Sequence, residues 1–375
     1  MAVEKKNVLI LSSWYPTPQN PFLGNFVQRQ AQLLNETYNV VVINIYADNN
    51  LHKTTIFESE DNGFREILIA HKETSNPLKR RLLQKNALHK AFRIISKIDL
   101  IIGNIILPKG WQFSLAKKHY NAPLIYVEHG SYFRPSILQK WSLKNKISVR
   151  RTIKNVDAIV AVSDFLKKDL ANFYQNKSIE VIGNSIDCEL FNIASKKSNE
   201  LFEFIHVSTL DPNTKNPSGL IDACEMLKND GLSFHMTIVS DEPTSKWQAY
   251  VNNLELSDFI SFVGPLKWEE LPAYYQKSDA FVLFSDYETF SIVLAEAWAC
   301  GIPTISTSVG IAYELDNKLG SIVNVGDSNQ LYKTMKEYIL GTRTFNTNEI
   351  RNHSLAYSKP RILNKWIQLI DKHVN

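Results

Sequence analysis

Short runs of apolar, mostly β-branched residues alternate along this chain with longer amphipathic segments, and this alternation limits the folds open to it. The first run is Val8–Ser12, and a segment with helical spacing follows at Phe26–Leu34. Continuous apolar runs are typical of parallel strands covered on both faces, so the alternation predicts doubly wound α/β sheets. The further runs are Val40–Ile45, Leu100–Ile102, Leu124–Val127, Ala158–Val162, Phe204–Val207, His235–Val239, Ile260–Val263, Ala280–Phe284 and Thr304–Ser306.

A polar stretch at Asn184–Lys197 interrupts the series, which restarts after it. A chain of 375 residues is long enough for two domains at roughly 100 to 200 residues each. We therefore expect two similar Rossmann-like domains, one over residues 1–188 and one over 189–354. In residues 355–375 the apolar side chains have mixed helical spacing. This spacing predicts a terminal helix that could pack on either domain, including back on the N-terminal one.

Composition excludes several classes of protein. A net charge of +4, with no arginine-rich tract or zinc-finger spacing, argues against nucleic-acid binding. The cysteines at 188, 224 and 300 are too few and too far apart for a disulfide framework or a zinc site. No apolar stretch approaches the ~20 residues that span a bilayer, and the run after Asn7 is too short for a signal peptide. We expect a cytoplasmic protein that could also bind peripherally at the inner face of the membrane.

The segment from Ala280 to Ser306 predicts a βαβ unit whose strand ends face a ligand. A strand ends near Phe284, a polar loop follows, and Phe290–Cys300 has helix-forming composition. Gly301 suits the position after a helix, and Pro303 prevents its continuation.

Two carboxylates flank the start of this helix. Glu288 lies in the loop, and Glu296 lies among apolar helix residues, where burial is costly without a partner. A hydroxyl-rich ligand would supply that partner, and the backbone amides near Phe290 and Ser291 would seat a phosphate. The alternative, that Glu288 is a solvated loop residue and Glu296 a surface position, is equally compatible with the spacing alone.

The string from Ser285 to Pro303 resembles the signature of the retaining glycosyltransferases of family 4, in which seven residues separate two glutamates. The resemblance extends over nearly the whole chain. Matching segments are Ser13–Pro16, Gly24–Val27, Glu128–Gly130, Val162–Ser163, Ile182–Asp187 with Phe191, Val263–Gly264, Asp279–Ala280 and Val309–Glu314. It implies two Rossmann-like domains that face a cleft (GT-B type), the first holding the acceptor and the second a nucleotide sugar.

The resemblance also implies a role for individual residues. Glu288 would hold donor sugar hydroxyls, Glu296 the ribose, and His129 would approach the reacting sugar, so that His129 and Glu288 are the candidate catalytic residues. Lys215 would neutralise the diphosphate as it leaves an oxocarbenium-like transition state. The family retains anomeric configuration, which is often explained by same-face attack without a protein nucleophile. The other candidate donor-binding residues are Gly24, Ser208, Thr209, Asn216, Thr289, Phe290 and Ser291.

The chain departs from the family at the phosphate end of this site. Where the family has glycine followed by a diphosphate-gripping arginine, this chain has Ser208 and Thr209. A hydroxyl cannot replace a bidentate guanidinium. Phosphate binding would then rest on Lys215, the helix-start amides, and Ser208 or Thr209.

Two basic segments, Leu78–Lys97 and Trp141–Lys154, could lie against anionic lipid, although an ordinary packed helix with a solvated basic face explains them as well. In the first, Leu78, Leu82, Ala87, Leu88, Phe92 and Ile95 would form the apolar face.

The leading hypothesis is transfer of a sugar from a nucleotide diphosphate to a glycan or lipid-linked glycan in surface polysaccharide or glycoconjugate synthesis. It needs no metal and no cofactor besides the nucleotide-sugar donor. The alternatives are epimerisation or phosphorolysis on the same architecture, and a degenerate, non-catalytic fold that binds glycans or partners.

Overall fold

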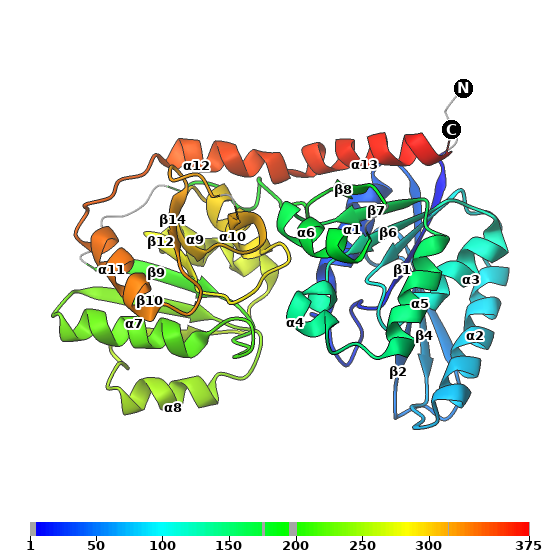
Figure 1. Ribbon diagram of the computed structural model, residues 1–375, viewed down its shortest axis with the longest axis horizontal. Coiled ribbons are helices and arrows are strands. Elements are labelled where there is room, and N and C mark those ends of the chain that lie inside the picture. Colours follow the sequence, from blue (N-terminus) through cyan, green and yellow to red (C-terminus); the bar gives the residue numbers. More distant parts are fainter. Residues whose placement is uncertain (1–4, 175–176, 195–200, 314, 375) are drawn as a thin grey trace. The chain divides into compact units, whose positions relative to one another are not determined.

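The computed structural model describes residues 5–174, 177–194, 201–313 and 315–374. Glu314 and the last three residues of the polar stretch, 195–197, lie outside the described residues, although both carried predictions above. The chain divides into two compact units (Figure 1). The first comprises Met1–Val162, Lys167–Asn184 and Ile362–Asn375, and the second comprises Ser163–Leu166 and Ser185–Arg361.

The first unit is built on a sheet with the strand order β3-β4-β2-β1-β5-β6-β7-β8. All neighbouring strands are parallel except β3 and β4, which pair antiparallel. The chain winds outward from β1 to one side and then returns to continue at β5 on the other, so the switch point lies between the ends of β1 and β5. The strands are β1 (Asn7–Ser12), β2 (Asn39–Ala47), β3 (Thr55–Ser59), β4 (Arg65–His71), β5 (Leu100–Asn104), β6 (Leu124–Glu128), β7 (Ala158–Ala161) and β8 (Ile179–Val181).

Helices join these strands and pack on the sheet. The contacts of α1 with β2, α2 with β4 and α3 with β5 are those of successive crossovers. The helices of this part are α1 (Asn25–Asn35), α2 (Pro77–Arg93), α3 (Trp111–Tyr120), η1 (Ser131–Phe133), α4 (Pro135–Leu138), α5 (Leu143–Lys154), α6 (Asp164–Phe173) from Lys167 onward, and α13 (Lys359–Val374) from Ile362 onward.

The second unit repeats the doubly wound plan with the parallel order β11-β10-β9-β12-β13-β14. Its switch point lies between β9 and β12. The strands are β9 (Phe202–Val207), β10 (Phe234–Val239), β11 (Ile260–Val263), β12 (Ala280–Leu283), β13 (Thr304–Thr307) and β14 (Gly320–Val323). The helices are α7 (Pro217–Asn229), α8 (Ser245–Asn253), η2 (Trp268–Glu270), α9 (Pro272–Lys277), α10 (Ile292–Ala299), η3 (Gly310–Ala312), α11 (Ser328–Ile339), α12 (Thr347–Ser354) and η4 (Leu355–Tyr357).

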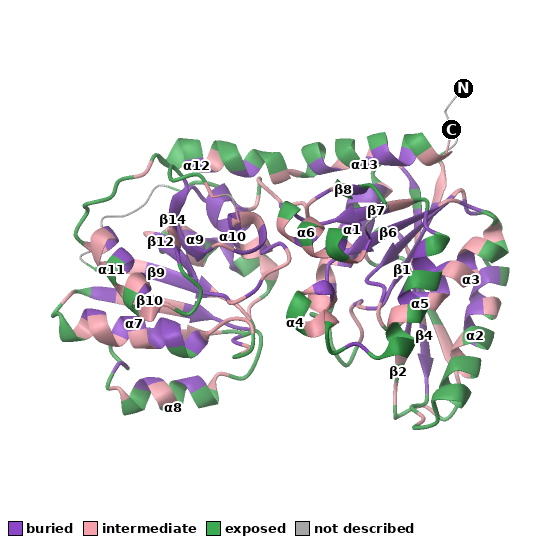
Figure 2. Cartoon of the chain, viewed as in Figure 1, coloured by how far each residue is buried: buried purple, intermediate pink, exposed green. Residues whose placement is uncertain are grey.

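Burial explains why the apolar runs form strands. In β9, Phe204 and Ile205 point to opposite faces and enter two different apolar clusters. The strands of both sheets are largely buried, whereas the outward faces of the helices are exposed (Figure 2). The predicted fold class, two doubly wound Rossmann-like domains, is confirmed. Within the described ranges, none of the helices combines the length and apolar character required to cross a bilayer.

Two local expectations need correction. Helix α10 begins at Ile292 rather than Phe290, because Ser291 adopts a left-handed conformation with φ of 71°. In α2, the predicted apolar face reaches the core only in its second half. Ala87, Leu88 and Phe92 are buried, but Leu78 is 80% exposed and Leu82 59% exposed.

Candidate active site

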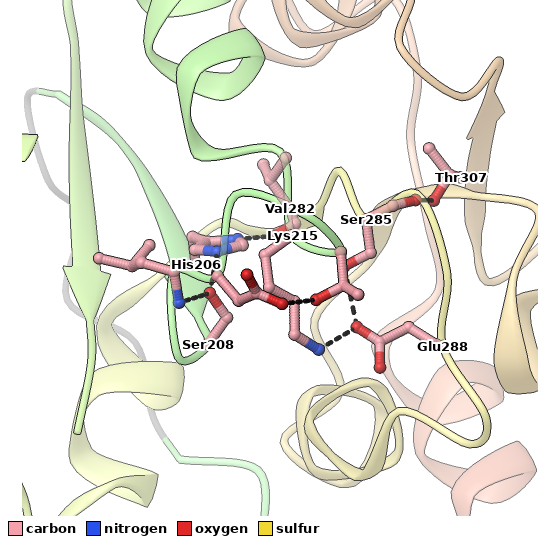
Figure 3. Close-up of polar contacts among 10 residues, drawn as sticks. His206, Ser208, Lys215, Val282, Ser285, Glu288 and Thr307 are labelled. Carbon is pink, nitrogen blue, oxygen red and sulfur yellow. Dashed lines mark hydrogen bonds and ion pairs between the residues drawn. The ribbon is translucent and has the colours of Figure 1, made fainter. Parts of the chain in front are cut away.

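The carboxyl ends of β9 and β12 bring Lys215 and Glu288 into direct contact. Lys215 follows β9 through a loop, and Glu288 lies in the loop after β12. The Lys215 ammonium donates to Glu288 Oε1 at 2.5 Å, and the two side chains are 19% and 11% exposed (Figure 3). Ser285 Oγ donates to the same oxygen at 2.8 Å. The pair lies at the switch point of the sheet, where open α/β sheets bind ligands.

Ser285 is itself held by the next strand. Thr307 Oγ1 donates to the Ser285 carbonyl at 2.6 Å, so β13 fixes the start of the loop that carries Glu288 (Figure 3). The loop is also tied to the one before it, because Asp286 N donates to the Thr214 carbonyl at 2.7 Å. Lys215 and Glu288 are therefore held by two loops that are hydrogen-bonded to each other.

Ser208 and Thr209 differ in what they can offer a ligand. Ser208 Oγ lies 2.7 Å from His206 Nε2 and accepts from Leu210 N at 3.0 Å, so its hydroxyl is engaged within the protein. Thr209 is exposed. Asn216 adopts φ of 46° and caps α7, since its side chain accepts from Gly219 N at 3.2 Å.

The first turn of α10 has no side-chain cap among the described residues. Ser291, at the N-cap, makes no side-chain cap, and its Oγ is buried with no hydrogen-bond partner among the described residues. Hydrogen bonds to the backbone carbonyls of the two preceding residues hold this loop in place. The Thr289 carbonyl accepts from Ser163 Oγ, and the Phe290 carbonyl accepts from Ile311 N at 2.9 Å. Helix-start amides without a side-chain cap can bind an anion.

Glu296 is 2% exposed and has protein partners of its own. Its Oε1 accepts from Trp268 Nε1 at 3.0 Å, and its Oε2 accepts from the Tyr275 hydroxyl at 3.4 Å. Burial first, and the Glu296 carboxylate second, raise the pKa of Tyr275 well above its usual range. Trp268 and Tyr275 therefore supply partners for the buried Glu296 carboxylate, which the sequence argument had expected from a ligand.

In the first unit, His129 follows β6 and is buried. His129 Nε2 lies 2.8 Å from Asn104 Oδ1, and Asn104 Nδ2 donates to Gln30 Oε1 at 3.0 Å. Because Asn104 presents an oxygen, Nε2 carries the ring hydrogen and Nδ1 carries a lone pair. Among the described residues, Nδ1 has no hydrogen-bond partner. The Phe26 ring stacks on the imidazole with centroids 4.6 Å apart.

The backbone around His129 is held by the preceding residue. Glu128 Oε1 accepts from His129 N at 2.9 Å and from Gly130 N at 2.6 Å, and Tyr126 donates to Oε2. Burial, the largest cause, raises the pKa of Glu128 to about 7 despite these donors.

Acid is expected to destabilise the protein through His129. Burial lowers the pKa of His129 from 6.5 to about 3. Between these two pH values His129 is protonated in the unfolded chain and neutral in the folded protein. The His129 contribution is therefore present above the unfolded pKa and is lost as the pH falls, by about 1.4 kcal/mol per pH unit. Urea unfolding of the wild type and His129→Gln should show a shallower pH dependence in the variant. Parallel curves would contradict this expectation.

Gly24 precedes α1 with φ of 71°, and a Cβ there would lie 2.5 Å from the Trp14 carbonyl oxygen. The close approach of the chain's own backbone is sufficient to require glycine at this position. A side chain would displace Trp14 or the start of α1.

Several residues of these networks were missed from the sequence: Gln30, Asn104, His206, Trp268 and Ser285. Asn104 is the last residue of β5 and Ser285 lies two residues after β12, and a polar residue at the end of an apolar strand was a usable signal. His206 lies inside a strand, and Gln30 and Trp268 lie on distant segments, so no local pattern marks them. Among the described residues, no group of three or more His, Cys, Asp or Glu side chains is arranged to hold a metal ion.

Two doubly wound Rossmann-like domains are the architecture of the GT-B fold. Sucrose-phosphate synthase from Thermosynechococcus elongatus superimposes with a TM-score of 0.77 at 19% identity, covering 98% of this chain and 99% of that one. The Anabaena protein HepE, in complex with UDP-glucose, gives a TM-score of 0.71 at 18% identity, covering 98% and 99%.

Sequence comparison gives the family. Residues 24–190 match the model of Glycosyltransferase Family 4, and residues 202–340 match that of Glycosyl transferases group 1. An uncharacterised glycosyltransferase of Methanocaldococcus jannaschii is 24% identical over 337 residues, covering 88% of this chain and 89% of that protein. The chain belongs to this glycosyltransferase family, as the resemblance implied.

Proposed function

We propose that this glycosyltransferase moves a sugar from a nucleotide diphosphate, with retention of configuration, to a glycan or lipid-linked glycan in surface polysaccharide or glycoconjugate synthesis. The proposal that the second unit binds the donor rests on the contact between Lys215 and Glu288 at the switch point of its sheet. An ammonium suits a diphosphate, and a carboxylate suits sugar hydroxyls. The complex of HepE with UDP-glucose supports a uridine nucleotide as the first donor to test.

In this proposal, the second unit binds the donor. Lys215 and the amides at Ser291 take the diphosphate, with Thr289, Phe290 and Asn216 shaping the loops around it. Glu288 binds the sugar, and Glu296, oriented by Trp268 and Tyr275, binds the ribose. The bond from the anomeric carbon to the phosphate oxygen breaks as the acceptor oxygen attacks the same face. The acceptor proton passes to the departing phosphate, so no protein nucleophile is required.

For the first unit, we propose that His129 binds a sugar hydroxyl as a hydrogen-bond acceptor. The ring is neutral, because burial lowers its pKa to about 3, and Nδ1, which has no partner in the described part of the chain, carries a lone pair. It is unsuited to donate a proton near neutral pH. Gly24 serves here by allowing the tight turn into α1.

A panel of nucleotide sugars tests the proposal directly. The wild-type chain should hydrolyse or transfer at least one donor in the panel, and both Glu288→Gln and His129→Ala should lower that rate. Glu255→Gln is a matched control, because Glu255 is 88% exposed and pairs with Lys228 at 3.5 Å. Absence of turnover and of binding with every donor would refute the donor assignment.

Replacement of Thr209 with arginine is expected to strengthen nucleotide binding. Thr209 is exposed two residues after β9. The glycosyltransferase family that the sequence resembles has at this place an arginine that binds the diphosphate. A guanidinium forms stronger, bidentate hydrogen bonds to phosphate, so we expect about tenfold tighter binding of UDP, or about 1.4 kcal/mol. Isothermal titration measures it, with Thr209→Gln as a long but uncharged control. Equal affinities for the two variants would contradict the expectation.

We also propose that the first unit contacts anionic membranes peripherally. Helix α3 contacts both α2 and α5, so the two basic helices lie on one side of this unit (Figure 1). Each exposes apolar side chains among its lysines and arginines. The exposed residues are Leu78, Leu82, Leu143 and Ile147. Basic helices with exposed apolar residues suit an interfacial position.

Flotation with vesicles tests this contact. The wild type should bind vesicles rich in phosphatidylglycerol at low salt but not neutral vesicles. Joint replacement of Leu78 and Leu82 by Asp should weaken binding by at least about tenfold, since each loses apolar burial and adds repulsion. Leu340→Asp, at a position 56% exposed in the second unit, is the control. Absence of wild-type binding would exclude the membrane proposal.

A further inference from the structure

His206 is a fully buried polar residue, the second-last of β9, and the proposed reaction gives it no role. Its Nδ1 lies 2.8 Å from the carbonyl oxygen of Val282 in the neighbouring strand (Figure 3). A carbonyl can only accept, so Nδ1 carries the ring hydrogen. Burial, the largest cause, lowers the pKa of His206 to about 4, and the ring is neutral. Nε2 therefore carries a lone pair.

The direction of the next hydrogen bond follows from this tautomer. Ser208 Oγ is 2.7 Å from His206 Nε2, so the hydroxyl donates its hydrogen to the ring. The same Oγ accepts from Leu210 N at 3.0 Å. The only hydrogen of the Ser208 hydroxyl is thus committed to the protein. Ser208 cannot donate to a phosphate in this arrangement.

The Ser208 hydroxyl holds a turn that is otherwise unfavourable. Leu210 has φ of 55°, a left-handed backbone conformation that residues other than glycine rarely adopt. Its side chain is nevertheless buried, with 3% exposed. The hydrogen bond from Leu210 N to Ser208 and the burial of the side chain hold the backbone there.

The turn leads directly to Lys215. Asp211 follows Leu210, and its carbonyl accepts from Lys215 N at 2.8 Å. Asp211 Oδ1 accepts from Asn213 N at 3.1 Å, and Oδ2 accepts from the Thr214 hydroxyl at 2.9 Å. A compact set of hydrogen bonds therefore connects the turn at Leu210 to the ammonium that contacts Glu288.

We propose that His206 is a positioning residue which, through the hydroxyl of Ser208, holds the loop that carries Lys215, so that its ammonium stays at the carboxyl end of β9, where it can meet a diphosphate. Serine at this position shapes the loop rather than contacting the nucleotide, and the diphosphate relies on Lys215 as its cation. This inference rests on the proposed function for its ligand, a nucleoside diphosphate. It adds two residues, His206 and Ser208, that act through Lys215.

Ser208→Ala removes one oxygen from the chain of hydrogen bonds. We expect UDP to bind about tenfold more weakly, because Leu210 N and His206 Nε2 each lose a partner and the loop no longer holds Lys215. Ser208→Thr keeps the hydroxyl and should restore most of the affinity. Ser257→Ala, at an exposed position, is the matched control.

A double-mutant cycle separates positioning from general destabilisation. If Ser208 acts through Lys215, Ser208→Ala should have less than twofold effect on UDP affinity in a Lys215→Ala background. Equal, additive effects in the two backgrounds would overturn the inference while leaving nucleotide binding intact. If the wild type binds no nucleotide, the proposed function fails, and a crystal structure of Ser208→Ala decides the inference. Separation of Lys215 from Glu288 would support it, and an unchanged contact would overturn it.

Discussion

Glu288→Gln is expected to lower the rate of sugar transfer by roughly 100-fold while UDP binding becomes tighter. The rate should fall because a neutral amide stabilises the positive charge of an oxocarbenium-like transition state less than a carboxylate does. Binding should tighten because the variant no longer offers Lys215 a carboxylate at 2.5 Å. The ammonium is then available to the diphosphate without first losing an ionic partner.

Initial rates with the best donor of the panel and titration of UDP measure the two effects. Glu255→Gln should change neither of them, because exposed ion pairs contribute little. Loss of both transfer and UDP binding would mean that the glutamine variant disturbs the loop. Unchanged transfer would remove Glu288 from the reaction.

Arg351→Ala is expected to destabilise the second unit by about 3 kcal/mol. The guanidinium donates to the carbonyls of Phe191, at 3.0 Å, Cys188, at 2.7 Å, and Ala299. Ala299 is the last residue of α10, and the other two belong to the segment that leads into this unit. Loss of the side chain leaves three carbonyls without this partner.

Thermal unfolding should show a fall of roughly 10 °C in Tm for a unit of this size. Arg351→Lys should fall between wild type and alanine, since one ammonium cannot reach all three carbonyls with the geometry of a guanidinium. Arg361→Ala, at an exposed position, should leave Tm unchanged. A shift of less than about 2 °C for Arg351→Ala would show that water replaces the lost hydrogen bonds.

The alternation of apolar runs with helical segments was sufficient to predict the fold, because central parallel strands are apolar throughout. Val8–Leu11 and Ala280–Leu283 are fully buried and were found without difficulty. Four strands were missed: β3, β4, β8 and β14. β3 is an edge strand with an exposed Phe57, and β4 begins with two charged residues. β8 has a glutamate at the centre of its three residues, and β14 begins with glycine and serine.

Site chemistry was less accessible to sequence reasoning, because it depends on contacts between distant segments. Lys215 and Glu288 were each identified as candidates, but their direct contact joins residues 73 apart in the chain. Ser208 was a candidate phosphate contact because Ser208 and Thr209 stand where the family has glycine and a diphosphate-binding arginine. Its engagement by His206 depends on a ring tautomer set by Val282, which no local pattern reveals.

The contact between Lys215 and Glu288 also bears on how a turnover ends. In the proposed donor site, departure of the sugar would free the Glu288 carboxylate, while the nucleoside diphosphate would still hold the Lys215 ammonium. The carboxylate can then compete for that ammonium from a distance of one hydrogen bond. Re-formation of the ion pair between Lys215 and Glu288 would favour dissociation of the nucleoside diphosphate. The enzyme would then be less inhibited by this product.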